Sequence, residues 1–240
     1  MRIAVLSDIH GNLPALEAVL ADLAPYDAVW QLGDVVGYGP QPDEVVARLA
    51  QEGALGVRGN HDSAALGELP TDAFNDDARR AVEWTGRRIG SATRDWLSAL
   101  PSRAELEGFT LVHASPRDPT WEYVVSAAVA RANLGAFETR HCLVGHTHVP
   151  LVFRQAEGRM ETIQPSQSGR LQLDGRRAIV NPGSVGQPRD GDRRACGLLL
   201  DTERATLEWR RVEYPVEQVQ RLMSERRLPL RLRLRLDYGL

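Results

Sequence analysis

Seven side chains able to bind a metal ion lie at the ends of five short apolar segments. The segments are IAVLSD (3–8), AVWQLGD (28–34), LGVRGN (55–60), FTLVHAS (109–115) and CLVGHTH (142–148). The side chains are Asp8, His10, Asp34, Asn60, His113, His146 and His148. Oxygen and imidazole ligands without a thiolate are typical of sites for Mn, Fe, Zn and related divalent ions. The sequence therefore predicts a metal site built from distant parts of the chain.

A single aspartate or histidine at such a position would mean little, because a lone Asp is commonly a helix cap and single motifs are weak. Five successive segments that end in such residues favour a shared functional site over isolated caps. Of the six histidines, only His141 falls outside the segment ends. In an open α/β sheet the loops at the carboxyl ends of the strands form the ligand crevice. We therefore expect all seven side chains at one edge of a sheet.

Seven ligands are too many for one ion that keeps an open position. They fit two ions about 3.5–4 Å apart, the usual spacing of two-metal hydrolytic sites, and such a pair needs a shared carboxylate as a bridge. Four glycines lie within or beside these segments, and we expect them to permit tight turns and close backbone approach. They are Gly33, Gly37, Gly59 and Gly145.

The elements that must position these residues follow from apolar spacing. The five segments are apolar on both faces, as expected for strands buried inside an α/β protein. LPALEAVLADL (13–23) and DEVVARLA (43–50) have helical spacing, so the first third is predicted as β-α-β-α-β. Residues 72–100 are predicted to be helical, and residues 151–180 to form β-hairpins with a turn at QPSQSG (164–169). Two further strands (196–201 and 206–214) and a short helix (215–225) follow.

Composition narrows the class of protein. The chain has 240 residues, a formal net charge of −3 and no composition break, which favours one domain over residues 1–240. A dedicated nucleic-acid binder usually has a basic field, so nucleic acid is not an expected partner. No apolar stretch approaches the roughly 18 residues that span a membrane, and we expect a cytoplasmic location. Cys142 and Cys196 cannot form a CxxC motif, and Cys142 is interpreted as a small buried apolar residue.

The ordered motifs resemble those of the calcineurin-like metallophosphoesterase superfamily. They are DIH (8–10), GDVVG (33–37), GNHD (59–62), His113 within LVHASP, and GHTH (145–148). SDIHGN near the start and NPGSVGQPRD late in the chain resemble the small bacterial phosphodiesterase branch. The resemblance implies a four-layer α/β/β/α sandwich in which two mixed β-sheets pack together between outer helices.

The same resemblance implies a role for each ligand. One metal ion would bind Asp8, His10 and His148, and the second would bind Asn60, His113 and His146, with Asp34 as the bridge. Manganese is the first expectation for the two divalent ions, and Fe, Zn, Ni, Co and Mg are alternatives. The implied reaction is attack of a metal-bound hydroxide on the phosphorus of a small phosphodiester, and of some phosphomonoesters.

The family role of His61 is proton donor to the leaving oxygen or stabiliser of charge beside the phosphate. Asp62 is predicted either to orient or tune His61, as a catalytic residue, or to cap the helix that follows.

The tripeptide PRD occurs twice, so Arg117 and Arg189 are both candidates for binding phosphate oxygens. Arg117 is the preferred substrate-binding candidate, and two surface turns are the alternative.

Two further features leave alternatives open. Trp121 and Tyr123 could form an apolar wall for the substrate, although loop packing is the favoured interpretation. The tail LPLRLRLRLDYGL (228–240) alternates leucine and arginine, which predicts a strand with a basic face. The loops 63–75, 115–125 and 155–175 are expected to carry specificity.

The alternatives to a phosphodiesterase are a dinucleoside polyphosphate hydrolase or a protein phosphatase with the same core. A nuclease and a scaffold without catalysis are ranked lower, since all seven ligand positions and His61 are present. The expected partner is a small phosphorylated substrate, with no membrane partner, and the oligomeric state is left open.

Overall fold

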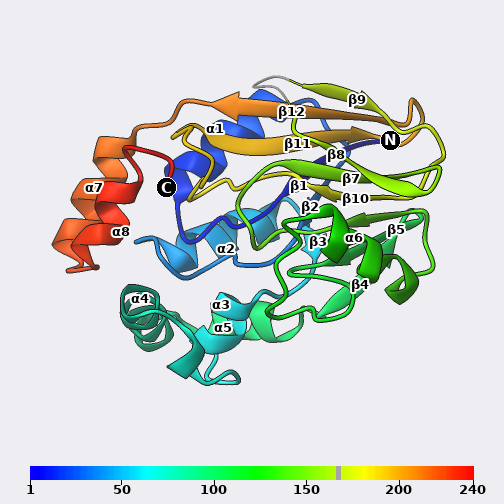
Figure 1. Cartoon of the computed structure of the whole chain (residues 1–240). Coiled ribbons are helices and arrows are strands. Elements are labelled where there is room, and N and C mark those ends of the chain that lie inside the picture. Colours follow the sequence, from blue (N-terminus) through cyan, green and yellow to red (C-terminus); the bar gives the residue numbers. More distant parts are fainter. Residues whose placement is uncertain (166–168) are drawn as a thin grey trace.

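The computed structural model of the chain describes residues 1–165 and 169–240. Over this range the strands form two six-stranded sheets (Figure 1). The first sheet has the order β3 (Leu55–Gly56), β2 (Ala28–Gln31), β1 (Arg2–Leu6), β11 (Ala195–Asp201), β12 (Thr206–Val212) and β9 (Arg170–Gln172). The second has the order β4 (Arg103–Leu106), β5 (Phe109–Val112), β6 (His141–Leu143), β10 (Ala178–Asn181), β7 (Leu151–Ala156) and β8 (Arg159–Ile163).

Each sheet is mixed and contains a parallel group of three strands. In the first sheet β1, β2 and β3 are parallel, and in the second β5, β6 and β10 are parallel. The other neighbouring pairs are antiparallel. Every predicted metal ligand follows a strand of one of these two parallel groups.

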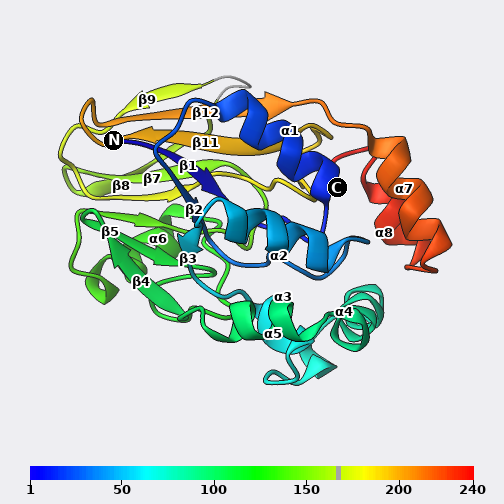
Figure 2. The ribbon, with the colours of Figure 1, turned by 180° about the vertical axis from the view of Figure 1, so that it is seen from behind.

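The helices cover the outer faces of the sheets. α1 (Leu13–Leu23) and α2 (Pro42–Gln51) connect the parallel strands of the first sheet and lie in front of it in Figure 2. A helical segment follows β3 and consists of α3 (Asn60–Ala65), a 3-10 turn (Thr71–Ala73), α4 (Asp76–Arg88) and α5 (Ser91–Ser98). α6 (Ala127–Asn133), continued by a 3-10 turn (Leu134–Ala136), lies between β5 and β6 in sequence, and α7 (Val216–Glu225) and α8 (Leu230–Arg235) follow β12.

Three buried apolar layers hold the sandwich together. Val5, Leu111 and Leu198 belong to the layer between the two sheets. Leu6, next to Val5 on the same strand, instead packs with α1, α2 and α7 on the outer face of the first sheet. α6 covers the second sheet through a third apolar cluster, which includes the fully buried Cys142. Strands buried on both faces explain why these segments are apolar at every position rather than at alternate ones.

Most of the predicted elements are confirmed. The four-layer sandwich, the β-α-β-α-β start and the helices within 72–100 and 215–225 are all present. The prediction for 151–180 is partly wrong: β7 and β8 form a hairpin, but β9 pairs with β12 in the other sheet and β10 is parallel to β6. The turn predicted at 164–169 lies partly outside the described residues. The sequence reasoning did not predict β4 or α6.

The strand predicted for the tail is wrong, because Leu230–Arg235 forms α8. Pro229 precedes this helix directly, a position that favours helix initiation. On a helix the alternating leucines fall on different faces: Leu232 and Leu236 are buried in the core, whereas Leu230 and Leu234 are exposed. The alternation of leucine and arginine therefore belongs to a helix that buries only a narrow face, formed by Leu232 and Leu236.

Candidate metal centre

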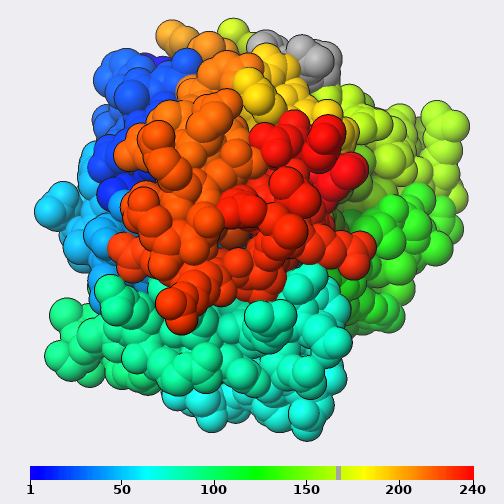
Figure 3. Space-filling model, turned by 90° about the vertical axis from the view of Figure 1, so that its left-hand side faces the viewer, coloured from blue at the N-terminus to red at the C-terminus, as the bar shows by residue number. Residues whose placement is uncertain are grey.

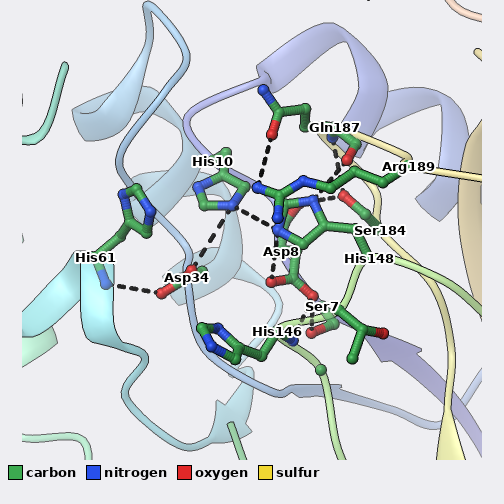
Figure 4. Close-up of polar contacts among 12 residues, drawn as sticks. Ser7, Asp8, His10, Asp34, His61, His146, His148, Ser184, Gln187 and Arg189 are labelled. Atoms are coloured by element: carbon green, nitrogen blue, oxygen red, sulfur yellow. Dashed lines mark hydrogen bonds and ion pairs between the residues drawn. The ribbon is translucent and has the colours of Figure 1, made fainter. Parts of the chain in front are cut away.

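The seven predicted ligands converge at one edge of the sandwich, at the carboxyl ends of β1, β2, β3, β5 and β6. Figure 4 shows Asp8, His10, Asp34, His146 and His148 among them. None of the seven is more than 4% exposed. Two overlapping groups of potential ligand atoms lie within 4.8 Å of one another: Asp8, His10, Asp34 and His148 in one, and Asp34, His113 and His146 in the other. Asp34 belongs to both groups. We call this set of seven residues the metal pocket.

The distances within the metal pocket define two clusters. In one, His148 Nε2 lies 3.2 Å from Asp8 Oδ1 and 3.3 Å from His10 Nε2. In the other, His113 Nε2 lies 3.1 Å from Asn60 Oδ1 and 3.1 Å from His146 Nδ1. Asp34 Oδ2 lies between the clusters, 3.7 Å from His10 Nε2 and 3.3 Å from His113 Nε2.

Backbone carbonyls orient three of the imidazole rings. The Nδ1 atoms of His10, His113 and His148 lie 3.1, 2.8 and 2.5 Å from the carbonyl oxygens of Val36, Leu32 and Gln187. Each Nδ1 therefore donates its proton to a carbonyl, which leaves the Nε2 lone pair facing the pocket. Asp8 Oδ1 is buried and accepts no hydrogen bond from the described residues. Inward lone pairs and an unpaired carboxylate oxygen fit divalent cations.

The pKa values show what burial does to these groups. Burial lowers the pKa of His146 to about 3 and the pKa values of His10 and His148 well below the usual range, so these rings are neutral and able to ligate. Burial raises the pKa of Asp8 to about 7. His113 and Arg189 oppose this shift without overcoming it, and bound metal ions would supply the further positive charge that favours an ionised Asp8.

Asp34 and His113 affect each other in the opposite direction. Burial alone would raise the pKa of Asp34 and lower that of His113. Their mutual attraction prevails, holding the pKa of Asp34 well below its usual range and raising that of His113 to about 9. Without a metal ion, His113 therefore holds a proton on Nε2 and acts as the counter-charge of the shared carboxylate; a bound cation would replace that proton and expose the Nε2 lone pair.

The backbone at the metal pocket is strained. Among the described residues, eight that are not glycine have a positive φ. Five of them are pocket residues: Asp8 (52°), His10 (51°), Asp34 (52°), His146 (65°) and His148 (61°). Such conformations cost of the order of 1–3 kcal/mol each and persist where the surroundings enforce them, commonly at functional sites. This concentration of strain marks the pocket without reference to any motif.

Glycines allow the loops of the pocket to approach one another closely. A Cβ atom on Gly59 would lie 2.1 Å from Asp34 Oδ1, and one on Gly145 would lie 2.0 Å from Ser7 Oγ. Neither contact is sterically possible. At these two positions glycine is required because the backbone lies directly against neighbouring protein side chains; close approach to a bound group, the other expected reason, stays a prediction.

The segment after β10 supports the metal pocket, and the sequence pattern did not predict this role. Ser184 Oγ donates to the carbonyl of Asp8 at 2.8 Å, and Asn181 Nδ2 donates to the carbonyl of Gly145 at 2.7 Å. Ser7 Oγ donates to Asp8 Oδ2 at 2.6 Å. Asn181 ends β10, so the strand-end criterion that found the ligands would also have found it.

His61 lies beside the pocket and 4% of it is exposed. Its backbone N–H donates to Asp34 Oδ1 at 2.9 Å, so the residue is tied to the shared carboxylate. Its ring packs at centroid distances of 4.4 Å against Tyr38 and 4.9 Å against Phe74. Nδ1 is buried and has no hydrogen-bond partner among the described residues. Burial lowers the pKa of His61 to about 4.

The structure does not place Asp62 where a tuning role for His61 requires it. Its carboxylate accepts from the backbone N–H groups of Val36 (3.0 Å) and Gly59 (3.0 Å). The alternative role, capping the helix, is present in a different form: α3 begins at Asn60 with Gly59 as its N-cap, and Asp62, the third residue of the helix, accepts from the Gly59 N–H as in a capping box. Asp62 also joins the loop after β2 to the start of α3, and burial raises its pKa to about 6.

The preference for Arg117 over Arg189 is not supported by the geometry. Arg117 is half exposed and forms an ion pair with Glu122. Arg189 lines a cavity of about 80 Å³ together with His61, His146 and His148. The Arg189 guanidinium donates to Gln187 Oε1 at 3.0 Å, and the two side chains lie together in Figure 4. No carboxylate lies within ion-pair distance of Arg189 in the described parts of the chain.

Aromatic side chains form one wall of the same cavity. Trp121 and Tyr123 both line it, with Phe74 and Tyr38. Tyr123 stacks on His146 at a centroid distance of 4.0 Å, and Trp121 packs against Phe74 at 5.3 Å. Two of the loops expected to carry specificity, 63–75 and 115–125, therefore reach the site, as predicted. The third, 155–175, lies partly outside the described residues.

Two mixed sheets with these strand-end ligands define a phosphoesterase fold of the calcineurin type. Residues 1–205 match the family model described as the calcineurin-like phosphoesterase superfamily domain, and the chain belongs to this superfamily.

Similar proteins agree with this membership. An uncharacterized protein of Methanocaldococcus jannaschii is 37% identical over 246 residues, covering 99% of this chain and 98% of the relative. The crystal structure of a metallophosphoesterase from Sphaerobacter thermophilus is 43% identical, with a TM-score of 0.92, and the match covers 100% of this chain and 99% of that one. Phosphodiesterase YfcE of Escherichia coli K12 is 29% identical over 215 residues, 83% of this chain and 87% of the relative.

The protein is therefore a phosphoesterase, a hydrolase of phosphoric esters, with a buried Asp/His cluster able to bind divalent metal ions. No helix in the described part of the chain is long and apolar enough to cross a membrane.

Proposed function

We propose that the protein is a two-metal phosphodiesterase of small substrates. Asp8, His10 and His148 hold one ion, Asn60, His113 and His146 hold the other, and Asp34 bridges them. The observation that carries this proposal is the position of Asp34 Oδ2, which faces His10 Nε2 at 3.7 Å and His113 Nε2 at 3.3 Å. When bound, two divalent ions would lower the pKa of a water molecule and neutralise charge on the phosphoryl oxygens.

The residues of the chain supply positioning and charge around the phosphoryl group. Arg189 is partly buried, lines the cavity and has no carboxylate partner among the described residues. Its guanidinium group binds the non-bridging phosphate oxygens. His61, with a free Nδ1 beside the shared carboxylate, hydrogen-bonds to the leaving oxygen. The aromatic wall of Trp121 and Tyr123 excludes water and contacts an apolar part of the substrate. The cavity of about 80 Å³ supports a small substrate.

We propose manganese as the native metal, residues 1–240 as one functional unit, and the cytoplasm as the location. Val216, Val219 and Met223 of α7 and Leu232 of α8 are buried in the core that covers the first sheet, which supports a single unit. Both cysteines are free and buried. Metal analysis of protein purified from its own host and cell fractionation test the metal and the location.

The experiment that tests the function combines metal content with a substrate panel. Purified protein is analysed for bound metal and assayed with added Mn on bis-p-nitrophenyl phosphate, phosphomonoesters, cyclic nucleotides and dinucleoside polyphosphates. We expect about two ions per chain and Mn-stimulated cleavage that is fastest on diesters. Fewer than one ion per chain, together with no Mn-stimulated turnover, would favour a scaffold without catalysis instead.

A further inference from the structure

The C-terminal helix α8 presents a pair of arginines toward the side of the molecule where α4 lies. Arg231 and Arg235 are four residues apart and therefore share one face of the helix. Figure 3 shows the C-terminal segment (red) meeting the surface of the α4 region (teal). The arginines thus come from one end of the chain and face a helix from its first half.

A groove of about 930 Å³ lies between the two helices. Its charged lining consists of Arg231 and Arg235 from α8 and of Asp76, Asp77 and Arg80 from α4. Asp76 forms an ion pair with Arg79, outside this lining. Among the described residues no carboxylate side chain lies within ion-pair distance of Arg80, Arg231 or Arg235. The Arg235 Nε donates to the main-chain oxygen of Leu240, which leaves the guanidinium NH₂ groups free to bind a ligand. We call this feature the arginine groove.

The arginine groove borders the cavity of about 80 Å³ beside the metal pocket. Asn75, the N-cap of α4, lines both of them. Burial, followed by the charge of Arg189, lowers the pKa of Arg235, so the two guanidinium groups lie within electrostatic range of each other. Arg231 and Arg189 both lower the pKa of Arg235, whereas Asp77 on the α4 side of the groove raises it.

We propose that the arginine groove binds a second anionic group of the substrate, a phosphoryl group beyond the scissile ester. The inference rests on the proposed phosphodiesterase activity and names the residues, Arg231 and Arg235, that select among its substrates. Guanidinium groups bind phosphoryl oxygens through paired hydrogen bonds. Arg231 and Arg235 form no ion pair with a carboxylate side chain of the described residues, although Asp76 and Asp77 line the same groove and Arg235 Nε donates to Leu240. A monoanionic diester fills only the cavity at the metals, whereas a longer, polyanionic ester reaches the groove.

Two substrates with the same leaving group test this proposal: the p-nitrophenyl ester of adenosine 5′-monophosphate and the γ-p-nitrophenyl ester of adenosine 5′-triphosphate. Both release p-nitrophenolate when water adds to phosphorus and the P–O(aryl) bond breaks, and only the second has further phosphoryl groups beyond the phosphorus that is attacked. With Mn kept in equal excess over each ester, we expect the KM of the triphosphate ester to be about tenfold lower in the parent protein. The double variant R231Q/R235Q should raise that KM to the value of the monophosphate ester and leave kcat on the monophosphate ester unchanged.

The matched control is Arg233→Gln, which removes the same charge from the same helix but outside the lining of the groove. It should preserve the tenfold difference in KM, and thermal unfolding of all variants checks that they are folded. Equal KM values in the parent, or the same loss of preference in Arg233→Gln, would overturn the arginine groove as a binding site. Absence of Mn-stimulated cleavage of either ester would overturn the phosphodiesterase proposal as well, so the two failures are distinguishable.

Discussion

The metal pocket and the arginine groove hold their functional groups in different ways. In the pocket, His10, His113 and His148 are buried, and backbone carbonyls fix their rings. In the groove, Arg231 is exposed at the surface and Arg235 is only partly covered. A fixed set of ligands does not need to reorganise when charge develops, whereas arginine side chains at the surface are less constrained by packing. The difference indicates that reactivity is built into strand ends and selectivity into helix surfaces.

Removal of the carboxylate that the two clusters share should cause the largest loss of metal binding and activity. Asp34→Ala removes the group that faces both clusters, so we expect loss of both metal ions and a fall in kcat/KM of about 10³-fold or more. Metal analysis and the bis-p-nitrophenyl phosphate assay measure both effects. Asp22→Ala on the exposed face of α1 is the control and should behave as the parent. Retention of two ions by the Asp34 variant would contradict its bridging role.

Replacing His61 should separate catalysis from metal binding. His61 lies beside the pocket and its side chain belongs to neither potential ligand group. His61→Ala should therefore lower kcat by about 10²–10³-fold while the metal content stays near that of the parent. Kinetics and metal analysis on the same preparation distinguish a catalytic role of His61 from a role as metal ligand. If the variant loses metal instead, His61 is a ligand and the division between pocket and cavity is wrong.

The metal pocket was more predictable from the sequence than its surroundings, for a physical reason. A parallel strand buried on both faces is apolar throughout, so the first polar residue after it, such as Asp8 or His113, stands out. Parallel strands then bring these positions to one edge. The role of Arg189 depends on which of two PRD turns faces the cavity, a question of tertiary packing. The role of Asp62 similarly depended on the start of α3, which lies three residues earlier than a helix that begins directly after Asp62.

Arg189 lies between the two regions, and its replacement should have an intermediate effect. Arg189→Gln removes a guanidinium from the catalytic cavity, so we expect kcat/KM on bis-p-nitrophenyl phosphate to fall about 10–100-fold. Arg117→Gln is the matched control, since the same tripeptide places Arg117 against Glu122 instead. Metal content should be unchanged in both. A larger loss in the Arg117 variant would restore the preference that the sequence suggested.

The smallest effect concerns His141, which shares β6 with the pocket but lies at the opposite end of the strand from His146. Burial lowers the pKa of His141 to about 4, below its unfolded value near 6.5, so the unfolded state binds the proton first as the pH falls. The free energy of unfolding of the parent therefore falls as the pH is lowered from 6.5 to 4. Above pH 7 His141 is neutral in both states and makes no such contribution. His141→Gln should reduce the loss of unfolding free energy between pH 7.5 and pH 5 by about 1–2 kcal/mol. Urea unfolding at the two pH values measures it, and activity at pH 7.5 should be unaffected. A loss of metal or of turnover in this variant would mean that burial of a histidine, rather than its place at the carboxyl end of a strand, is what matters to the metal pocket.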